Sequence, residues 1–328
     1  MSILCSGSFV ADILVPDLPN IGPPGSLIYA PNGIHLSPGG HSSNVSIDLA
    51  QLGIQNVNAV GAVGKDEMGD FLIEQLRNRG VKPIPQIIEN STTAKNVALL
   101  VEGEDRRYIA ELTANSLLSS SYLMNIITEV KPSIFYQGTL GGLPDIERNL
   151  NNVLQKTQSQ DVLNIVDVIM PTNGWGYLNV AASYIDILHA NQLEASNLTM
   201  ENEPIRAVKT LNQMGIKLAI VSDGQKGVIA ATEAYIITMP SYTVKQQDPT
   251  GAGDALCAGM INHIYTNKIT SENILDPELI IDTLLIGQAA GAACVTGLGA
   301  TTSVTKENLE TILEQRETVR NKTKLRKK

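Results

Sequence analysis

The sequence predicts an α/β protein with a doubly wound, mostly parallel central sheet flanked by helices, and with a small β-sheet lid. An apolar strand at 3–10 starts the chain, and the second half alternates apolar strands with helices, as a doubly wound sheet requires. Two segments depart from this alternation. Segment 13–37 is rich in Pro and Gly, and segment 87–112 has hairpin-like alternation. We expect these two segments to form the lid.

Apolar periodicity and Gly or Pro breaks set the other expected elements. Short apolar runs predict strands at 58–64, 133–137, 161–168 and 217–222, a hairpin within 228–237, and a short helix followed by a strand within 180–188. Helical spacing predicts helices at 45–52, 70–79, 144–156, 207–214 and 279–294.

The length of 328 residues suits one large domain, expected at 1–310, with a helix end and a basic tail at 311–328. A hydrophobic content of 43% predicts a sizeable core. The formal net charge of -9 argues against a nucleic-acid partner, because there is no basic stripe to neutralise phosphates. The basic residues within 322–328 are expected to form a frayed, solvated tail.

The three cysteines, Cys5, Cys257 and Cys294, are far apart and lack metal-binding spacing, which favours reduced thiols in a cytosolic protein. No apolar run is long enough to span a membrane. The N-terminal segment lacks the pattern of a signal peptide. We therefore expect a cytoplasmic protein without a membrane partner.

The segment 248–254, Asp-Pro-Thr-Gly-Ala-Gly-Asp, has the strongest chemical signal in the chain. Gly251 and Gly253 leave backbone amides uncovered, so that successive N–H groups face one anion, and the helix that follows adds its positive end. Asp254 lies in the first turn of that helix, where its carboxylate can take a proton from a group that attacks a phosphate. A Gly-rich turn with an Asp cap is the alternative that this motif alone leaves open.

A second group of polar residues lies near the first strand. Asp12 follows that strand, at the edge of a parallel sheet where ligands bind, and either accepts ligand hydroxyls or caps a turn. Gly39 and Gly40 precede a helix in which Asn44 lies one turn from the start. This arrangement suits a polyol pocket or a Gly-rich helix cap with a buried Asn. His41 contacts substrate or caps the same helix.

Two further motifs follow strands of the second half. Asn191 and Glu194 lie three positions apart after a strand, and Glu194 suits a water-bridged magnesium ion. A helix-capping pair is the alternative. The turn from Ser222 to Gly227 offers amides and a hydroxyl for nucleotide phosphates.

In this order, the motifs resemble those of the ribokinase-like (PfkB) carbohydrate kinase family. The resemblance extends from residue 6 to about residue 303, and its most specific parts are Gly39-Gly40 with Asn44 and the segment 248–254. It implies a ribokinase-like fold and ATP-dependent transfer of a phosphoryl group to a hydroxyl of a sugar-like substrate.

The resemblance also implies residue roles. Asp254 would be the general base, and the amides of Gly251, Ala252 and Gly253 would form the anion hole. The substrate-binding set comprises Asp12, Gly39, Gly40, His41, Asn44 and Asn115, and the nucleotide-binding set comprises Asn191, Ser222, Asp223, Gly224 and Gly227. Glu194 would hold Mg²⁺ through water, and Asp248, Thr250 and Ser303 would hold a monovalent cation such as K⁺.

The distribution of basic residues favours a neutral substrate, a sugar or a polyol. Family members that act on acidic or phosphorylated sugars usually place Arg or Lys in the substrate pocket, and segments 1–64 and 161–190 contain neither. In the lid, Arg106 or Arg107 is the remaining candidate for a counter-charge to an anionic substrate.

Two other functions stay open at this point. A nucleoside kinase of the same family would stack a base on lid aromatics such as Tyr29 and Tyr108. A non-catalytic sensor of sugars or nucleotides would share the fold, but the intact motif around Asp254 argues against it. The exposed edges of a lid sheet favour a homodimer.

Overall fold

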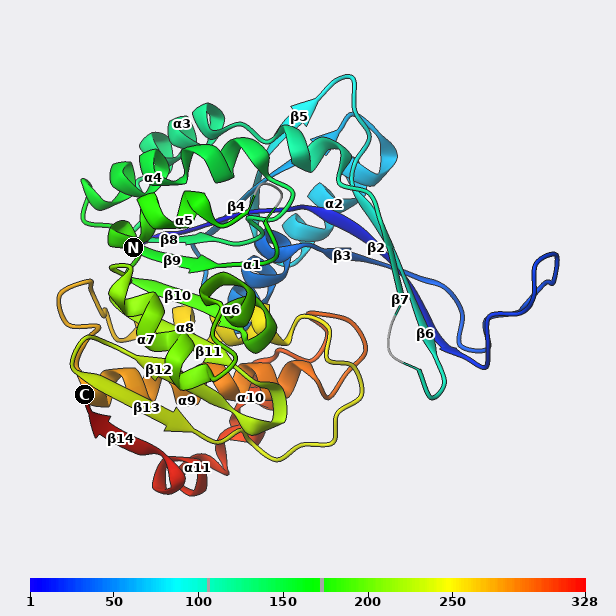
Figure 1. Cartoon of the computed structure of the whole chain (residues 1–328). Helices are drawn as coiled ribbons and strands as arrows, with labels where there is room; N and C mark the ends of the chain where they lie inside the picture. Colours follow the sequence, from blue (N-terminus) through cyan, green and yellow to red (C-terminus); the bar gives the residue numbers. More distant parts are fainter. Residues whose placement is uncertain (105–106, 172–173) are drawn as a thin grey trace.

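The computed structural model describes residues 1–104, 107–171 and 174–328. Within these ranges, one sheet has the strand order β14-β13-β12-β11-β10-β9-β8-β1-β4-β5 (Figure 1). β1 (Ile3–Ser6) pairs in parallel with both β4 (Val57–Gly64) and β8 (Ile134–Gln137). The strand order therefore changes direction beside β1, and open α/β sheets bind ligands at such a point.

The strands on either side of this centre continue the parallel arrangement. β5 (Lys82–Ile88) pairs with β4, and β9 (Leu163–Asp167), β10 (Ile187–Asn191) and β11 (Leu218–Ser222) follow β8. β12 (Val228–Ala231) and β13 (Tyr235–Met239) are antiparallel. Because parallel strands end at one edge of a sheet, the residues that follow β1, β8, β9, β10 and β11 lie near one another.

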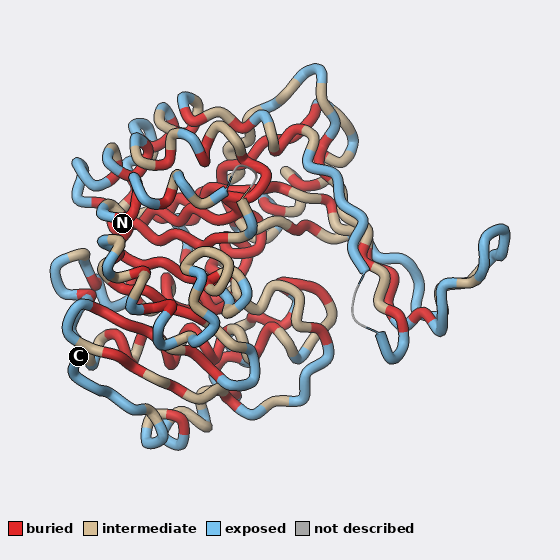
Figure 2. The backbone as a smooth tube through the Cα atoms, viewed as in Figure 1, coloured by how far each residue is buried: buried red, intermediate tan, exposed pale blue. Residues whose placement is uncertain are grey.

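Helices cover both faces of the large sheet, and the strands between them are buried (Figure 2). One face packs against α1 (His41–Gln51), α2 (Glu67–Asn78), α8 (Ala252–Thr266), α9 (Pro277–Cys294), α10 (Lys306–Leu313) and α11 (Arg316–Lys322). The other face packs against α3 (Ser120–Val130), α4 (Pro144–Gln158), α5 (Gly176–Ala181), α6 (Gln192–Thr199) and α7 (Pro204–Gln213). Among the described residues, no helix combines the length and the apolarity of a membrane span.

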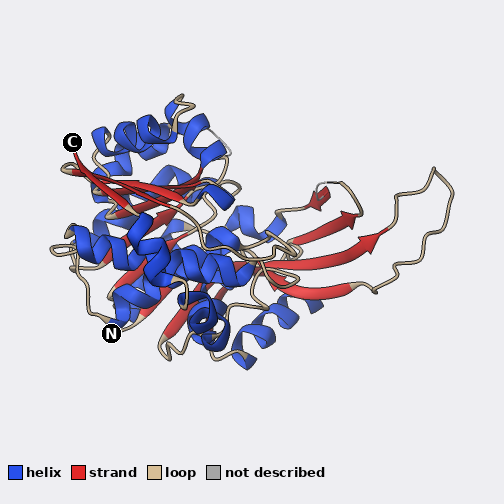
Figure 3. Ribbon diagram, turned by 90° about the horizontal axis from the view of Figure 1, so that it is seen from below, coloured by secondary structure: helices blue, strands red, loops and turns tan. Residues whose placement is uncertain are grey.

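A second sheet projects from the body as the predicted lid (Figure 3). It has the order β3-β2-β6-β7, with β2 (Val10–Leu18), β3 (His35–Gly39), β6 (Lys95–Val101) and β7 (Arg107–Ala110). The loop 19–34 joins β2 to β3 and extends farther from the body (Figure 1). The predicted fold class, a mostly parallel sheet flanked by helices with a separate small sheet, is confirmed.

The C-terminal segment differs from the frayed tail that its basic residues predicted. β14 (Lys324–Lys327) pairs antiparallel with β13, and Leu325 lies opposite Ile237. Arg320 of α11 forms ion pairs with Asp282 and Glu278 of α9. The free edge of β13 offers backbone hydrogen bonds whatever the charge of the incoming side chains, and charged side chains on an edge strand discourage further pairing.

Candidate active site

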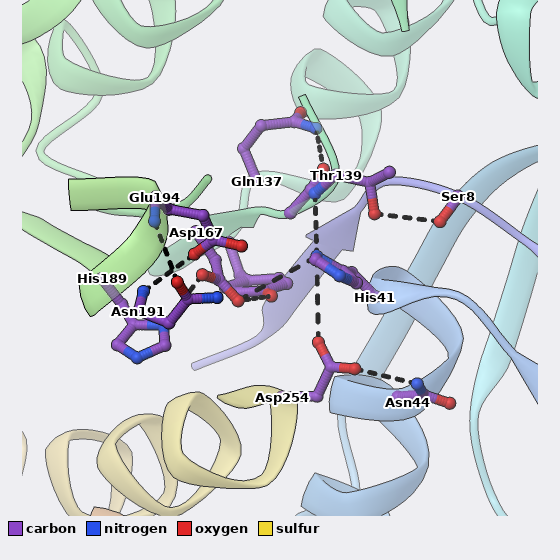
Figure 4. A network of polar contacts seen from close by, with 12 residues as sticks. Ser8, His41, Asn44, Gln137, Thr139, Asp167, His189, Asn191, Glu194 and Asp254 are labelled. Atoms are coloured by element: carbon purple, nitrogen blue, oxygen red, sulfur yellow. Dashed lines mark hydrogen bonds and ion pairs between the residues drawn. The ribbon is translucent and has the colours of Figure 1, made fainter. Parts of the chain in front are cut away.

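Asp254 lies in the first turn of α8, and its side chain is buried (6% exposed). Asn44 of α1 donates from Nδ2 to Oδ2 of Asp254 at 2.8 Å (Figure 4). Oδ1 is buried and has no hydrogen-bond partner within the described residues. Burial raises the pKa of Asp254. One carboxylate oxygen is thus held in place, and the other is left to accept a proton.

The backbone before Asp254 approaches its neighbours closely. Gly251 has φ 80°, in the left-handed region, and a Cβ there would lie 2.5 Å from Cβ of Ala300. A Cβ on Gly253 would lie 3.3 Å from Cε1 of His189. The first amides of a helix have no acceptors within that helix. The N-terminus of α8 therefore offers N–H groups and a positive dipole end to an anion.

A cavity of about 360 Å³ lies beside this N-terminus, a size that suits a small-molecule ligand. We call it the Ser222 cavity. Small residues shape it from two sides, because Gly253 of α8 and Gly291 of α9 both line it. The predicted nucleotide-binding residues on its wall are Ser222, Gly224 and Gly227.

The other predicted nucleotide-binding residues have local partners. Asp223 accepts from Nζ of Lys226 at 2.9 Å. Asn191 and Glu194 form a capping box at the start of α6: Oδ1 of Asn191 accepts from the Glu194 amide at 2.9 Å, and Oε2 of Glu194 accepts from the Asn191 amide at 2.8 Å. Burial raises the pKa of Glu194 to about 7. The capping interpretation of this pair is therefore realised, and the carboxylate is still poised to ionise near neutrality.

On the lid side, Asp12 of β2 accepts from Nδ2 of Asn96 in β6 at 3.1 Å. A Cβ on Gly39 would collide with the Asp12 carboxylate, so any larger residue there would displace that carboxylate. Burial raises the pKa of Asp12 to about 6. The Oδ1 atoms of Asn96 and Asn44 are buried without hydrogen-bond partners in the described part of the chain. These atoms suit the recognition of ligand hydroxyls.

His41, the first residue of α1, lies between two carboxylates (Figure 4). Its Nδ1 is 3.9 Å from Oδ1 of Asp254 and 4.0 Å from Oδ2 of Asp167. Nδ1 also accepts from the amide of Thr139 at 3.0 Å. Gly40 precedes it with φ 90°, and a Cβ there would collide with the Ser8 carbonyl. Glycine at this position thus lets α1 begin close to the backbone of Ser8.

The structure corrects the expectation for Asn115, which was predicted to bind substrate. Asn115 lies in the short 3₁₀ helix Thr113–Leu117 and is fully buried. Its Oδ1 accepts from the Phe9 amide at 3.1 Å, and its Nδ2 donates to the Phe9 carbonyl at 2.9 Å. Both amide groups are used to fix the backbone just before β2, so Asn115 is a structural residue.

A buried chain of hydrogen bonds links the neighbouring strands β8, β9, β10 and β11 near Asp254. His189 in the middle of β10 lies opposite Asp167 at the end of β9, and its Nδ1 is 2.8 Å from Oδ1 of Asp167. Nε2 of His189 is 3.0 Å from Oγ of Ser222, and Oη of Tyr136 donates to Oδ2 of Asp167 at 3.1 Å. A metal ion held by both groups at about 2.0 Å would spread their atoms farther apart than a hydrogen bond does. This cluster is therefore a hydrogen-bonded network.

Asp167, His189 and Asn96 were absent from the predicted site. Asp167 could have been found from the sequence, because it follows an apolar run as the last residue of a parallel strand, whereas His189 lies two residues before the end of its strand. Asn96 lies inside a lid strand and belongs to no motif.

Asp248 joins the loop before α8 to the loop after α9. Its Oδ1 accepts from the amide of Thr250 at 2.9 Å, and its Oδ2 accepts from the amide of Gly299 at 2.9 Å. Sγ of Cys294 donates to the Thr250 carbonyl at 3.2 Å. The predicted cation ligands Asp248 and Thr250 thus lie beside the loop that contains Ser303, and the monovalent cation itself stays a prediction.

The lid contacts the body near this corner, since Oη of Tyr108 is 3.3 Å from Oγ1 of Thr250. Arg107 of the lid forms an ion pair with Glu104, and Lys95 forms one with Glu111. Arg106, the other candidate for a counter-charge, lies outside the described residues.

Known proteins are similar to this chain in sequence and in fold. Residues 2–307 match the model of the pfkB family carbohydrate kinases. Fructokinase-2 of Oryza sativa subsp. japonica is 26% identical over 302 residues, which cover 88% of this chain and 88% of that protein. Ribokinase of Haemophilus influenzae is 24% identical over 307 residues, which cover 91% of this chain and 93% of that protein.

The fold is shared with a solved structure of a fructokinase with bound ATP from Xylella fastidiosa. Its TM-score is 0.81 at 23% identity, over 96% of this chain and 99% of that chain. Because the family model spans nearly the whole chain, this protein belongs to the pfkB family of carbohydrate kinases, phosphotransferases that act on a hydroxyl group.

Proposed function

We propose that the protein transfers the γ-phosphoryl group of ATP to a hydroxyl of a neutral sugar or polyol. The observation that carries the proposal is the position of Asp254. Its carboxylate lies at the N-terminus of α8, beside the Ser222 cavity, with Oδ2 bound by Asn44 and Oδ1 without a hydrogen-bond partner in the described residues. A buried carboxylate next to an anion site is the arrangement that a kinase base requires.

Asp254 acts as the general base in this proposal. The acceptor hydroxyl donates to Oδ1 of Asp254, which takes the proton as the oxygen attacks the phosphoryl group. Asn44 keeps the carboxylate oriented through Oδ2. The raised pKa of Asp254 makes it a stronger base than an exposed Asp. A positive charge on the neighbouring His41 lowers this pKa again.

The phosphates occupy the side of the site where α8 begins. The amides of Gly251, Ala252 and Gly253 stabilise the charge of the transferred group, since a helix N-terminus binds anions. Ser222, Gly224 and Gly227 line the remainder of the ATP site. Glu194, whose raised pKa of about 7 leaves it partly ionised at neutral pH, would hold Mg²⁺ through water. When bound, Mg²⁺ supplies charge neutralisation at the phosphates.

The acceptor lies on the lid side, between Asp12, Asn96 and Asn44. Asp12 and the two amide oxygens offer hydrogen-bonding groups and no positive charge, which suits a neutral polyhydroxy compound. Lys95 and Arg107 of the lid are already paired with Glu111 and Glu104. Relatives named fructokinase and ribokinase are in keeping with a neutral sugar.

A coupled ADP-release screen tests this function. Purified protein with ATP and Mg²⁺ is assayed against neutral ketoses, aldoses, polyols and nucleosides, and against the corresponding sugar phosphates. We expect turnover with a neutral sugar or polyol, and the Asp254→Asn variant assayed in parallel identifies activity from contaminating kinases. Turnover restricted to phosphorylated acceptors would refute the neutral pocket, and turnover restricted to nucleosides would reassign the substrate class.

A further inference from the structure

His189 lies directly behind the wall of the Ser222 cavity. Its side chain is 3% exposed, and its Nε2 is 3.0 Å from Oγ of Ser222, which lines the cavity. The same ring lies close to the helix N-terminus, because a Cβ on Gly253 would be only 3.3 Å from Cε1 of His189. One buried imidazole is therefore 3.0 Å from the Ser222 hydroxyl and lies beside the backbone of the proposed phosphate site.

Asp167 fixes the orientation of this imidazole. An ionised carboxylate only accepts hydrogen bonds, so Nδ1 of His189 carries a proton that it donates to Oδ1 of Asp167 at 2.8 Å. Burial raises the pKa of Asp167, but the neighbouring His189 opposes this effect, and the net pKa is below its usual value. Tyr136 holds the other carboxylate oxygen. The ring cannot flip without breaking the bond to Asp167, so Nε2 is directed at Ser222.

We propose that the Asp167–His189 pair positions the Ser222 hydroxyl for the phosphates of the nucleotide, an inference that rests on the proposed kinase function. When Nε2 carries a proton, it donates to Oγ, and the Ser222 hydrogen is left to point toward a phosphate oxygen. When Nε2 has no proton, it accepts that hydrogen, and the lone pairs of Oγ face the phosphates. His189 is thus a positioning residue that acts through Ser222.

The charges around His189 favour the protonated form. Burial alone would lower the pKa of His189, but Asp167 raises it, as do Glu194 and Asp254, so that the net direction is upward. A bound phosphate adds further negative charge and therefore favours a proton on Nε2 still more. The groups that face His189 are Asp167 of β9, Glu194 of α6, Asp254 and Cys257 of α8, His41 of α1 and Ser222 of β11.

Calorimetry of ADP binding tests this coupling without turnover. Titrations are made in two buffers of different ionisation enthalpy and without divalent ions, so that Mg²⁺ does not contribute. The His189→Gln variant is titrated in parallel, because Glu194, whose pKa is about 7, also takes up protons near a bound phosphate. Over the pH range in which the terminal phosphate is ionised, we expect the wild type to take up more protons on binding ADP than His189→Gln does. The affinity for ADP should be full below the pKa of His189 and should fall as the pH rises through it.

Three variants separate positioning from a general structural effect. His189→Asn retains a donor for Asp167 and loses the donor for Ser222, so the KM for ATP should rise about two- to tenfold. The KM for the acceptor should stay unchanged. His189→Gln places a permanent amide donor near Nε2, so nucleotide affinity should be retained while the part of the pH dependence and of the proton uptake that comes from His189 disappears. In a Ser222→Ala background, His189→Asn should have no further effect.

His263→Gln is the matched control, since His263 lies near the other end of α8, where its Nδ1 is 3.0 Å from Oγ1 of Thr283. It should leave both measurements unchanged. Thermal unfolding shows which variants are folded, and His189→Gln keeps the test decisive if His189→Asn does not fold. An equal effect of His189→Asn with and without Ser222, or equal proton uptake by the wild type and His189→Gln, would overturn the positioning role but not the kinase function. A complete lack of ADP and ATP binding would overturn the kinase function itself.

Discussion

Asn44 donates from Nδ2 to Oδ2 of Asp254 across 2.8 Å, although the two residues are 210 positions apart in sequence. This bond joins the start of α1 to the start of α8. It occupies one oxygen of the proposed base and leaves Oδ1 for a proton. The glycine motif before α1 and the glycine motif before α8 therefore act as two parts of one site.

Removing the proton acceptor tests the role of Asp254. Asp254→Asn keeps the shape of the side chain but loses its basicity, so kcat should fall by about 100- to 10,000-fold. The ADP-release assay measures this loss. Asp70→Asn, an exposed Asp in the first turn of α2, is the control and should have wild-type activity. Near-normal turnover of Asp254→Asn would show that the base lies elsewhere.

The bond from Asn44 should be visible in the pH profile. It lowers the pKa of Asp254, against the larger effect of burial, which raises it. Asn44→Ala therefore raises that pKa, and because the ionised form is the active one, the acid limb of kcat/KM should move to higher pH. Asn78→Ala, on the exposed end of α2, serves as the comparison. An unshifted acid limb would contradict the electrostatic role of Asn44.

Gly251 should be sensitive to a single added carbon. Gly251→Ala forces an alanine into φ 80° and places its Cβ 2.5 Å from Cβ of Ala300. The variant should lose about 1 to 3 kcal/mol of unfolding free energy in urea titrations, and kcat should fall as the anion hole shifts. Gly176→Ala is the control, because nothing lies within 4 Å of a Cβ at Gly176. A Gly251→Ala variant with normal stability would argue against this close approach.

Magnesium dependence should follow the ionisation of Glu194. Burial raises the pKa of Glu194 to about 7, so the apparent Mg²⁺ affinity should rise as the pH increases through that value and then level off. Glu194→Gln should weaken Mg²⁺ activation by roughly 10- to 100-fold and should abolish this inflection. Activity is titrated with MgCl₂ on both sides of neutrality. An inflection that persists in Glu194→Gln would assign it to another group.

Asp48 of α1 is fully buried, and neither of its carboxylate oxygens has a hydrogen-bond partner within the described ranges. Burial raises the pKa of Asp48 well above its usual value, and the charge of Asp254 raises it further. Because the folded state holds the proton more tightly than the unfolded state, stability is lost as the pH rises above about 4.

Asp48→Asn removes this dependence. In urea titrations, the variant should be more stable than the wild type at neutral pH, and the two should converge below the ordinary pKa of Asp. Asp70→Asn again provides an exposed control. A variant that is less stable at neutral pH would show that the Asp48 carboxylate is stabilised by its surroundings.

The sequence by itself determined the alternation of strands and helices, because apolar periodicity is a local property of the chain. It also located both glycine motifs, since tight turns and bare helix N-termini require glycine within a few residues. Asp254, Asn44 and Asp12 were identified from their positions beside these motifs and strand ends. In the folded protein the three residues lie close together: Asn44 donates to Asp254, and the charge of Asp254 contributes to the raised pKa of Asp12.

Only the tertiary structure decided which polar groups meet across the strands. The local sequence around Asn115 does not show that the side-chain amide of Asn115 bonds to the backbone of Phe9 through both its oxygen and its nitrogen. The pairing of His189 with Asp167 depends on the register of β9 against β10, and Asn96 reaches Asp12 only because β6 pairs with β2. The basic tail becomes a strand because β13 leaves an edge free. Hydrogen bonding between distant segments is set by packing, which no short stretch of sequence encodes.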